Sequence, residues 1–209
     1  MFADRAEAGR ALAAALDHLR DEAPVVLALP RGGVPVALPI ARRLGCPLDL
    51  LLVRKLGVPG HEELAAGALV DEGEVRVVQN DDVIRAYGIT PQTLDAVIAR
   101  ERREVERRRR LYLGDRQRAG VAGRTAIVVD DGIATGATVR AALAGLKAAK
   151  PRRLVVAVPV APPETVAALR REVDGVVTLA TPERFHAIGA FYRNFTQVSD
   201  EEVRAALAS

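Results

Sequence analysis

The fold is decided by the segment Ala126-Ile127-Val128-Val129-Asp130-Asp131-Gly132-Ile133-Ala134-Thr135-Gly136-Ala137-Thr138. Its four leading apolar residues are typical of a strand that is buried in a parallel sheet. Two acidic residues follow where that strand must end. A run of small residues and hydroxyls then leads into a helical pattern that places Val139, Leu143 and Leu146 on one side. The segment therefore predicts a strand, a loop and the start of a helix, which is the repeating unit of α/β folds.

The loop in this segment has the chemistry to bind a sugar phosphate. Backbone N–H groups converge at a helix start, the helix dipole favours an anion, and Gly136 allows close approach. Thr135 and Thr138 add hydroxyl donors. Asp130 and Asp131 would repel a phosphate, but they suit a sugar diol or a hydrated Mg2+ on the same ligand. The alternative is an ordinary turn with a capping aspartate, although a cap needs only one acid.

Two further strand ends carry charge or glycine. Residues 24–29 form a short apolar run, which is followed by Pro30-Arg31-Gly32-Gly33 and a helical pattern over 34–44. Residues 48–53 are also apolar and end in Arg54-Lys55. The carboxyl ends of parallel strands lie at one edge of a sheet, where ligands bind in open α/β folds. We therefore expect both basic segments to lie at the same edge as the two acids.

The segment 126–138 resembles the 5-phosphoribosyl-1-pyrophosphate (PRPP) signature of type I phosphoribosyltransferases, in its apolar run, two acids and Ala-Thr-Gly-Ala-Thr loop. The resemblance implies an α/β fold with a doubly wound, mostly parallel sheet and a small hood and lid region. It also implies Mg2+-assisted transfer of a phosphoribosyl group from PRPP to a nitrogenous base with release of pyrophosphate, as in nucleotide salvage. In the family, the loop after the first core strand binds pyrophosphate and commonly contains a cis peptide bond that precedes a residue other than proline.

The resemblance also implies a role for each motif residue. The residues expected to bind the 5-phosphate are Ala134, Thr135, Gly136, Ala137 and Thr138. Those expected to bind the pyrophosphate are Arg31, Gly32, Gly33, Arg54 and Lys55. Two acids are expected to hold the ribose hydroxyls and to keep Mg2+ in place through water, namely Asp130 and Asp131. The expected catalytic set is Asp130, Asp131, Arg31, Lys55 and Glu62.

Residues 56–70 are expected to contain a lid loop, because glycine and proline interrupt regular structure over 56–63. The run 53–60 is similar to the Arg-Lys-x-Gly-x-x-Pro segment of adenine phosphoribosyltransferases. His61, Glu62 or Glu63 could transfer a proton to the base, or each could be a solvated loop residue. Family members that act on 6-oxopurines usually carry an aspartate where this chain has Ala134, which disfavours hypoxanthine and guanine as acceptors.

The remaining segments are interpreted as insertions and a tail around one domain of residues 1–209. A hairpin is predicted over 65–78, and a helical insertion over about 80–115 contains a long helix that Thr90 caps. The arginines and glutamates of that helix indicate either a solvated, ion-paired face or a surface that contacts RNA or another subunit. The aromatic-rich tail, about 181–209, is expected to form a hood over the acceptor base or simply to pack on the core.

Composition excludes several classes of protein. The 209 residues carry a net charge of +3, which suits anionic ligands but is too mild to argue for nucleic acid. No apolar run is long enough to span a bilayer, no signal peptide is expected, and the one cysteine forms no internal disulfide. We therefore expect a cytoplasmic enzyme that binds PRPP and a small base, with a homo-oligomer possible. The alternative is a PRPP-binding regulatory protein without turnover that contacts RNA or a protein partner.

Overall fold

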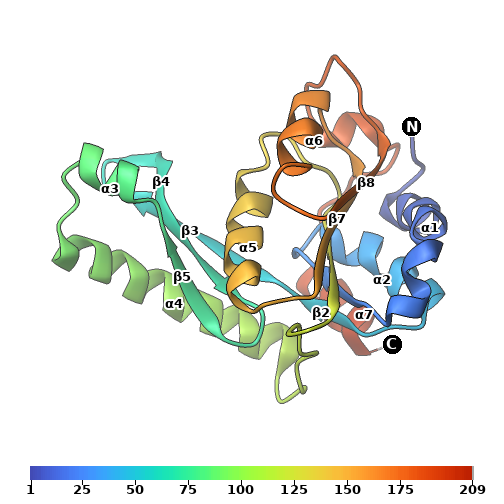
Figure 1. Ribbon diagram of the computed structural model, residues 1–209, viewed down its shortest axis with the longest axis horizontal. Coiled ribbons are helices and arrows are strands. Elements are labelled where there is room, and N and C mark those ends of the chain that lie inside the picture. The colour runs from blue at the N-terminus through green and yellow to red at the C-terminus, as the bar shows by residue number, and fades with distance from the viewer. Residues whose placement is uncertain (209) are drawn as a thin grey trace.

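The computed structural model describes residues 1–208, except for the side chains of Glu62 and Glu63. Figure 1 shows a body with a central sheet and an arm that extends away from it. The five strands of the central sheet are all parallel and lie in the order β2-β1-β6-β7-β8. Their bounds are β1 Val25–Ala28, β2 Leu48–Leu50, β6 Thr125–Val129, β7 Arg153–Val160 and β8 Gly175–Ala180.

Helices cover both faces of the central sheet. On one face lie α1 (Arg5–Ala15), α2 (Gly33–Leu44) and α7 (Asp200–Ala208), and on the other lie α5 (Ala137–Ala148) and α6 (Pro163–Leu169). Alternate residues of each strand enter opposite cores, as the pleat of a strand requires. In β1, for example, Val26 packs with α2 and α7, whereas Leu27 packs with α5. The predicted doubly wound, mostly parallel fold is confirmed.

The strand order creates a switch point between β1 and β6. After β1 the chain passes through α2 to β2 at one edge, and after β6 it passes through α5 to β7 on the other side. Neighbouring parallel strands whose connections depart in opposite directions leave a crevice at their carboxyl ends. Two of the three predicted segments, 30–33 and 130–138, begin at that crevice.

The arm consists of residues 52–113. It contains the antiparallel sheet β3-β4-β5 and two helices, whose bounds are β3 Leu52–Val58, β4 His61–Asp71, β5 Val75–Gln79, α3 Asp81–Ala86 and α4 Pro91–Leu113. Helix α5 packs against the base of this sheet, where a Cβ built at Gly145 would lie 2.5 Å from the Cβ of Val70. The arm is therefore joined to the helix that begins at the predicted phosphate loop.

The structure corrects two predictions in this region. The predicted strand 48–53 divides at Leu51, so that β2 stays in the parallel sheet and β3 leaves it for the arm. The predicted irregular loop is also wrong, because 56–63 belongs to a β-hairpin whose turn is Pro59–Gly60. Leu56 and Val58 are buried, and this burial outweighs the local preference of glycine and proline for loops.

Helix α4 follows the sequence prediction closely. The hydroxyl of Thr90 accepts a hydrogen bond from the N–H of Thr93, Pro91 occupies the first helical position, and the helix ends at Leu113. Its surface carries ion pairs one helical turn apart, such as those of Arg107 and Arg108 with Glu104. These contacts match the predicted ion-paired face. In the described residues, no helix is both long enough and apolar enough for a membrane span.

Candidate active site

The acids that end β6 lie against the loop that ends β1. A Cβ built at Gly32 would lie 2.1 Å from Oδ2 of Asp131, and one at Gly33 would lie 2.5 Å from the carbonyl oxygen of Val129. At Gly33 the neighbouring atoms are backbone, so only glycine allows the approach, and a larger residue at Gly32 would have to displace the carboxyl group of Asp131. The segment Pro30–Gly33 (the arginine loop) and Asp130–Asp131 (the acid pair) are therefore neighbours at the switch point. The Pro30–Arg31 peptide bond is cis, as the resemblance implies.

Each member of the acid pair has a different environment. Asp130 is half-buried, and burial together with the neighbouring charge of Asp131 raises the pKa of its carboxyl well above the usual value. The side chain of Asp131 is buried against Arg5, whose Nε donates a hydrogen bond of 2.7 Å to Oδ2. Burial raises the pKa of Asp131, and the Arg5 guanidinium partly offsets this rise. Asp130 is thus the acid that forms no ion pair with a cationic side chain of the described chain.

The contacts around Asp131 were not predicted from the sequence. Arg5 lies over the ring of Phe195, with its Cζ 3.8 Å from the ring centroid, and donates to the carbonyl of Thr196. The hydroxyl of Tyr192 donates a hydrogen bond of 2.6 Å to the carbonyl oxygen of Asp131. These contacts connect α1 and the tail to the acid pair across long stretches of sequence, and no local pattern could have revealed them.

Replacing Arg5 by methionine should destabilise the protein by roughly 3 kcal/mol at neutral pH, because it leaves a buried carboxylate without its counter-ion. Methionine retains an apolar stem against Phe195. The loss should shrink as the pH falls, since a protonated Asp131 no longer needs a cation. Urea unfolding at neutral and mildly acidic pH measures both effects. Arg10→Met, at an exposed position of the same helix, is the matched control. Equal losses in the two variants would contradict the role of Arg5.

The predicted phosphate loop, 134–138, is open to ligand. Thr135 and Thr138 are exposed, and their hydroxyls form no hydrogen bond within the described chain. Gly136 has a φ of 77° and precedes α5, and no side chain caps the helix. The first-turn N–H groups of α5 therefore lack a side-chain acceptor and are available to an anion. The Thr165 hydroxyl donates to the carbonyl of Ala134 and holds the loop from behind.

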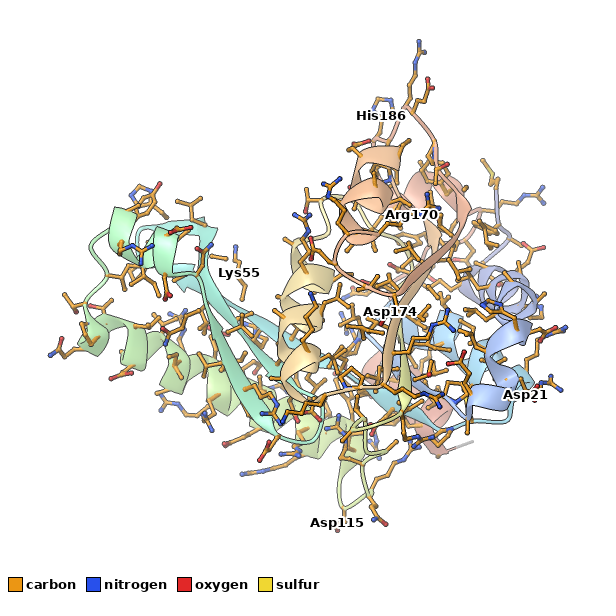
Figure 2. All side chains as sticks on the ribbon, in the orientation of Figure 1. Asp21, Lys55, Asp115, Arg170, Asp174 and His186 are labelled. Atoms are coloured by element: carbon orange, nitrogen blue, oxygen red, sulfur yellow. The ribbon has the colours of Figure 1, made fainter. Side chains whose placement is uncertain are left out.

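Two of the residues that were predicted to bind the pyrophosphate, Arg54 and Lys55, lie on β3 in the arm. Arg54 was expected at the edge of the parallel sheet, but its side chain forms an ion pair of 2.7 Å with Glu101 on α4. This placement is a correction, and it follows from the departure of β3 from the central sheet. Lys55, the next residue, lies on the opposite face of the strand, and Figure 2 shows it on the side of the arm that faces α5. The predicted proton donor Glu62 lies outside the described side chains.

The tail reaches the site through a short helix, η2 (Ile188–Phe191). A Cβ built at Gly132 would lie 2.6 Å from Cγ2 of Ile188, so the tail touches the loop beside the acid pair. The rings of Phe185 and Phe191 stack with centroids 5.5 Å apart. Helix α7 instead packs against α2 and α4, so the last part of the predicted hood belongs to the body.

The carboxylates of the acid pair suit a metal ion that is bound together with a phosphate-bearing ligand. Within the described residues, no group of three or more histidine, cysteine, aspartate or glutamate side chains could form a complete protein site. Mg2+ is commonly held by one or two carboxylates together with the phosphates of a substrate. Asp130 and Asp131 could supply that protein share.

The chain is similar to proteins of one known family. The profile of the phosphoribosyl transferase domain matches residues 3–195. The chain belongs to the phosphoribosyl transferase family. Two putative phosphoribosyl transferases, from two Mycobacterium tuberculosis strains, are each 50% identical over 207 residues. The alignments cover 99% of this chain and 46% of those proteins, so the chain spans about half the length of these relatives.

A solved structure of a similar protein shares the fold of this chain. The crystal structure of TT1426 from Thermus thermophilus has a TM-score of 0.84 and 47% sequence identity. The comparison covers 99% of this chain and 97% of that one. The similarity therefore includes the arm as well as the body of this chain.

Proposed function

We propose that this phosphoribosyl transferase transfers the phosphoribosyl group of PRPP to a nitrogenous base and releases pyrophosphate, with the help of Mg2+. The observation that carries the proposal is the contact between Asp131 and Gly32 at the switch point. A ligand with phosphate at both ends of a ribose needs two anion-binding loops on either side of a diol-binding acid. The phosphate loop, the acid pair and the arginine loop meet that requirement at one edge of the sheet.

In this proposal, each end of PRPP has its own loop. The amides and hydroxyls of 134–138 bind the 5-phosphate, and the arginine loop binds the pyrophosphate. Asp130 accepts hydrogen bonds from the ribose hydroxyls, because Asp131 is already engaged by Arg5. Lys55, from the inner side of the arm, adds positive charge at the pyrophosphate end. Burial of these contacts fixes C1 of the ribose for attack.

The chemistry is a substitution at C1. The bond from C1 to the pyrophosphate oxygen breaks, a nitrogen of the acceptor forms the new bond, and the electron pair leaves with pyrophosphate. The transition state resembles a ribosyl oxocarbenium ion, so charge grows on the leaving group. Arg31 and Lys55 stabilise that charge, and one well-placed group of this kind typically supplies about 3 kcal/mol. Bound Mg2+ would supply further neutralisation of the phosphates.

The acceptor is proposed to bind between the acid pair and the tail. Ile188 against Gly132 and the stacked Phe185 and Phe191 provide apolar surface on that side. Ala134 is exposed at the mouth of the phosphate loop and has no group that could protonate a purine. We therefore propose an acceptor other than hypoxanthine or guanine.

A panel of bases with PRPP and Mg2+ tests the proposed reaction. We expect pyrophosphate release that requires both Mg2+ and an acceptor, and exchange of labelled pyrophosphate into PRPP. Hypoxanthine and guanine should be poor acceptors relative to the best base of the panel. PRPP binding by calorimetry without turnover on any base would reject the transferase and leave the regulatory alternative. Absence of PRPP binding would reject both.

A further inference from the structure

The arginine loop is connected to two helices through one acid. Asp200, the first residue of α7, lies 3.6 Å from a guanidinium nitrogen of Arg31. The same oxygen of Asp200 accepts a hydrogen bond of 2.6 Å from the hydroxyl of Tyr112, near the end of α4. The capping box of Ser199 and Glu202 fixes the first turn of α7 and hence the place of Asp200.

Tyr112 gives this contact a rigid support. Its ring is buried in the core between α4 and α7. Burial and the hydrogen bond to Asp200 raise the pKa of Tyr112 to about 12, so the hydroxyl remains a donor at neutral pH. The Arg31 side chain, by contrast, is 35% exposed, and within the described structure Asp200 is the only acid with which it forms an ion pair. The position of the guanidinium therefore depends on Asp200.

We propose that Asp200 is a positioning residue for Arg31, which it holds beside the pyrophosphate end of the site, and that Tyr112 positions Asp200 in turn. The inference rests on the proposed function, since it concerns how the arginine loop binds the pyrophosphate of PRPP. It adds two residues to that end of the site, one from the C-terminal helix and one from the helix of the arm.

The negative charge of Asp200 also has an effect on pyrophosphate binding that opposes its positioning of Arg31, and the sizes of the two effects decide which dominates. It repels an approaching pyrophosphate, so its removal would strengthen binding. Asp200 and Arg31 are both about one-third exposed or more, and solvent screens such charges strongly. Leaving Arg31 unrestrained instead requires a long side chain to be ordered at the moment of binding, which weakens affinity about 3- to 10-fold. We therefore expect the loss of order to dominate.

Titration calorimetry with two ligands tests the proposal. Asp200→Ala should weaken binding of PRPP and of inorganic pyrophosphate, each with Mg2+, by about 3- to 10-fold. Binding of ribose 5-phosphate, which lacks the pyrophosphate, should change less than about twofold by the same estimate. Asp200→Asn keeps an acceptor oxygen and should restore most of the affinity. Tyr112→Phe removes only the hydroxyl, so it should weaken PRPP binding less than Asp200→Ala does.

The chain offers a matched control in Glu201→Ala. Glu201 is the next acid of the same helical turn, is exposed and faces a groove between α4 and α7. This variant should bind PRPP as the wild type does. In an Arg31→Ala background, Asp200→Ala should have no further effect, since the residue that it positions is gone.

Several results would overturn the inference alone. These are unchanged or tighter PRPP binding by Asp200→Ala, equal weakening of ribose 5-phosphate binding, or equal weakening by Glu201→Ala. Failure of the wild-type protein to bind PRPP would instead overturn the proposed function together with the inference. The two failures are therefore distinguishable in one set of titrations.

Discussion

Replacing Asp130 and Asp131 together by asparagine should abolish binding of PRPP with Mg2+ and leave the fold intact. Asparagine has almost the same shape as aspartate, so the contact with Gly32 is preserved. The variant loses both charges that could hold a metal ion and accepts fewer hydrogen bonds from a ribose diol. Calorimetry with PRPP and Mg2+ measures the loss, and circular dichroism follows the fold.

The stability of the single variants should separate the two acids. The folded state raises the pKa of Asp130, so its ionised form opposes folding. Above the unfolded value of 3.8, the folded protein binds more protons than the unfolded one, and wild-type stability therefore falls as the pH rises towards the raised pKa. Asp130→Asn lacks this loss and should be at least as stable as the wild type at neutral pH. Asp131→Asn should gain less stability than Asp130→Asn, or none, because Arg5 partly offsets the rise in the pKa of Asp131 and loses its anionic partner in this variant.

Asp115→Asn provides the control, because Asp115 is exposed and lies in the linker after α4. It should bind PRPP with wild-type affinity. Retained PRPP affinity in the double variant would contradict the proposed role of the acid pair. Lost affinity with a lost fold would mean that the acids are structural.

Replacing Arg118 by methionine should cause the largest loss of stability, about 3 to 5 kcal/mol. Arg118 lies where the arm joins the body. It contacts Asp49 at 3.0 Å and Asp71 at 3.4 Å, and it donates a hydrogen bond of 2.6 Å to the carbonyl of Leu50. Asp49 is 1% exposed and Asp71 is fully buried. The variant leaves the Asp49 carboxylate in the interior without a cation, and Asp71 keeps only its contact with Arg109 at 3.5 Å.

Urea unfolding of Arg118→Met measures this effect, with Arg102→Met on the exposed side of α4 as the control. The control should change the free energy of unfolding by less than about 0.5 kcal/mol. Proteolysis should also cut the variant sooner in residues 52–113, since Asp49 precedes β3 and Asp71 ends β4. A loss below about 1 kcal/mol would contradict the assignment of Arg118 as the junction.

Local patterns were sufficient to predict the strand–loop–helix units and several helix ends. The acid pair and the arginine loop follow buried strands, and parallel strands bring their carboxyl ends to one edge. Thr90 and Pro91 set the start of α4, and Ser199 with Glu202 set the start of α7. In each case the deciding residues lie within a few positions of one another.

Contacts between distant segments could not be predicted in this way. Arg54 follows an apolar run just as Arg31 does, but β3 belongs to a different sheet and turns Arg54 towards α4. Asp131 pairs with Arg5 at the start of α1, and Arg31 pairs with Asp200 at the start of α7. In the sequence, Arg5 and Asp200 each look like an ordinary residue at a helix start. Their pairing depends on how α1 and α7 pack on the sheet, which no short pattern encodes.

The opening residues of the chain add a practical consequence. Backbone hydrogen bonds join Phe2 to Phe191 and Arg193, a few positions before Arg5 meets Asp131. A group attached near Phe2 would therefore lie close to Arg5 and the acid pair, and removing Phe2 would remove the backbone hydrogen bonds that help to orient that arginine. Experiments on ligand affinity are best made with this end unaltered, and labels or immobilising groups are better attached to the outer tip of the arm.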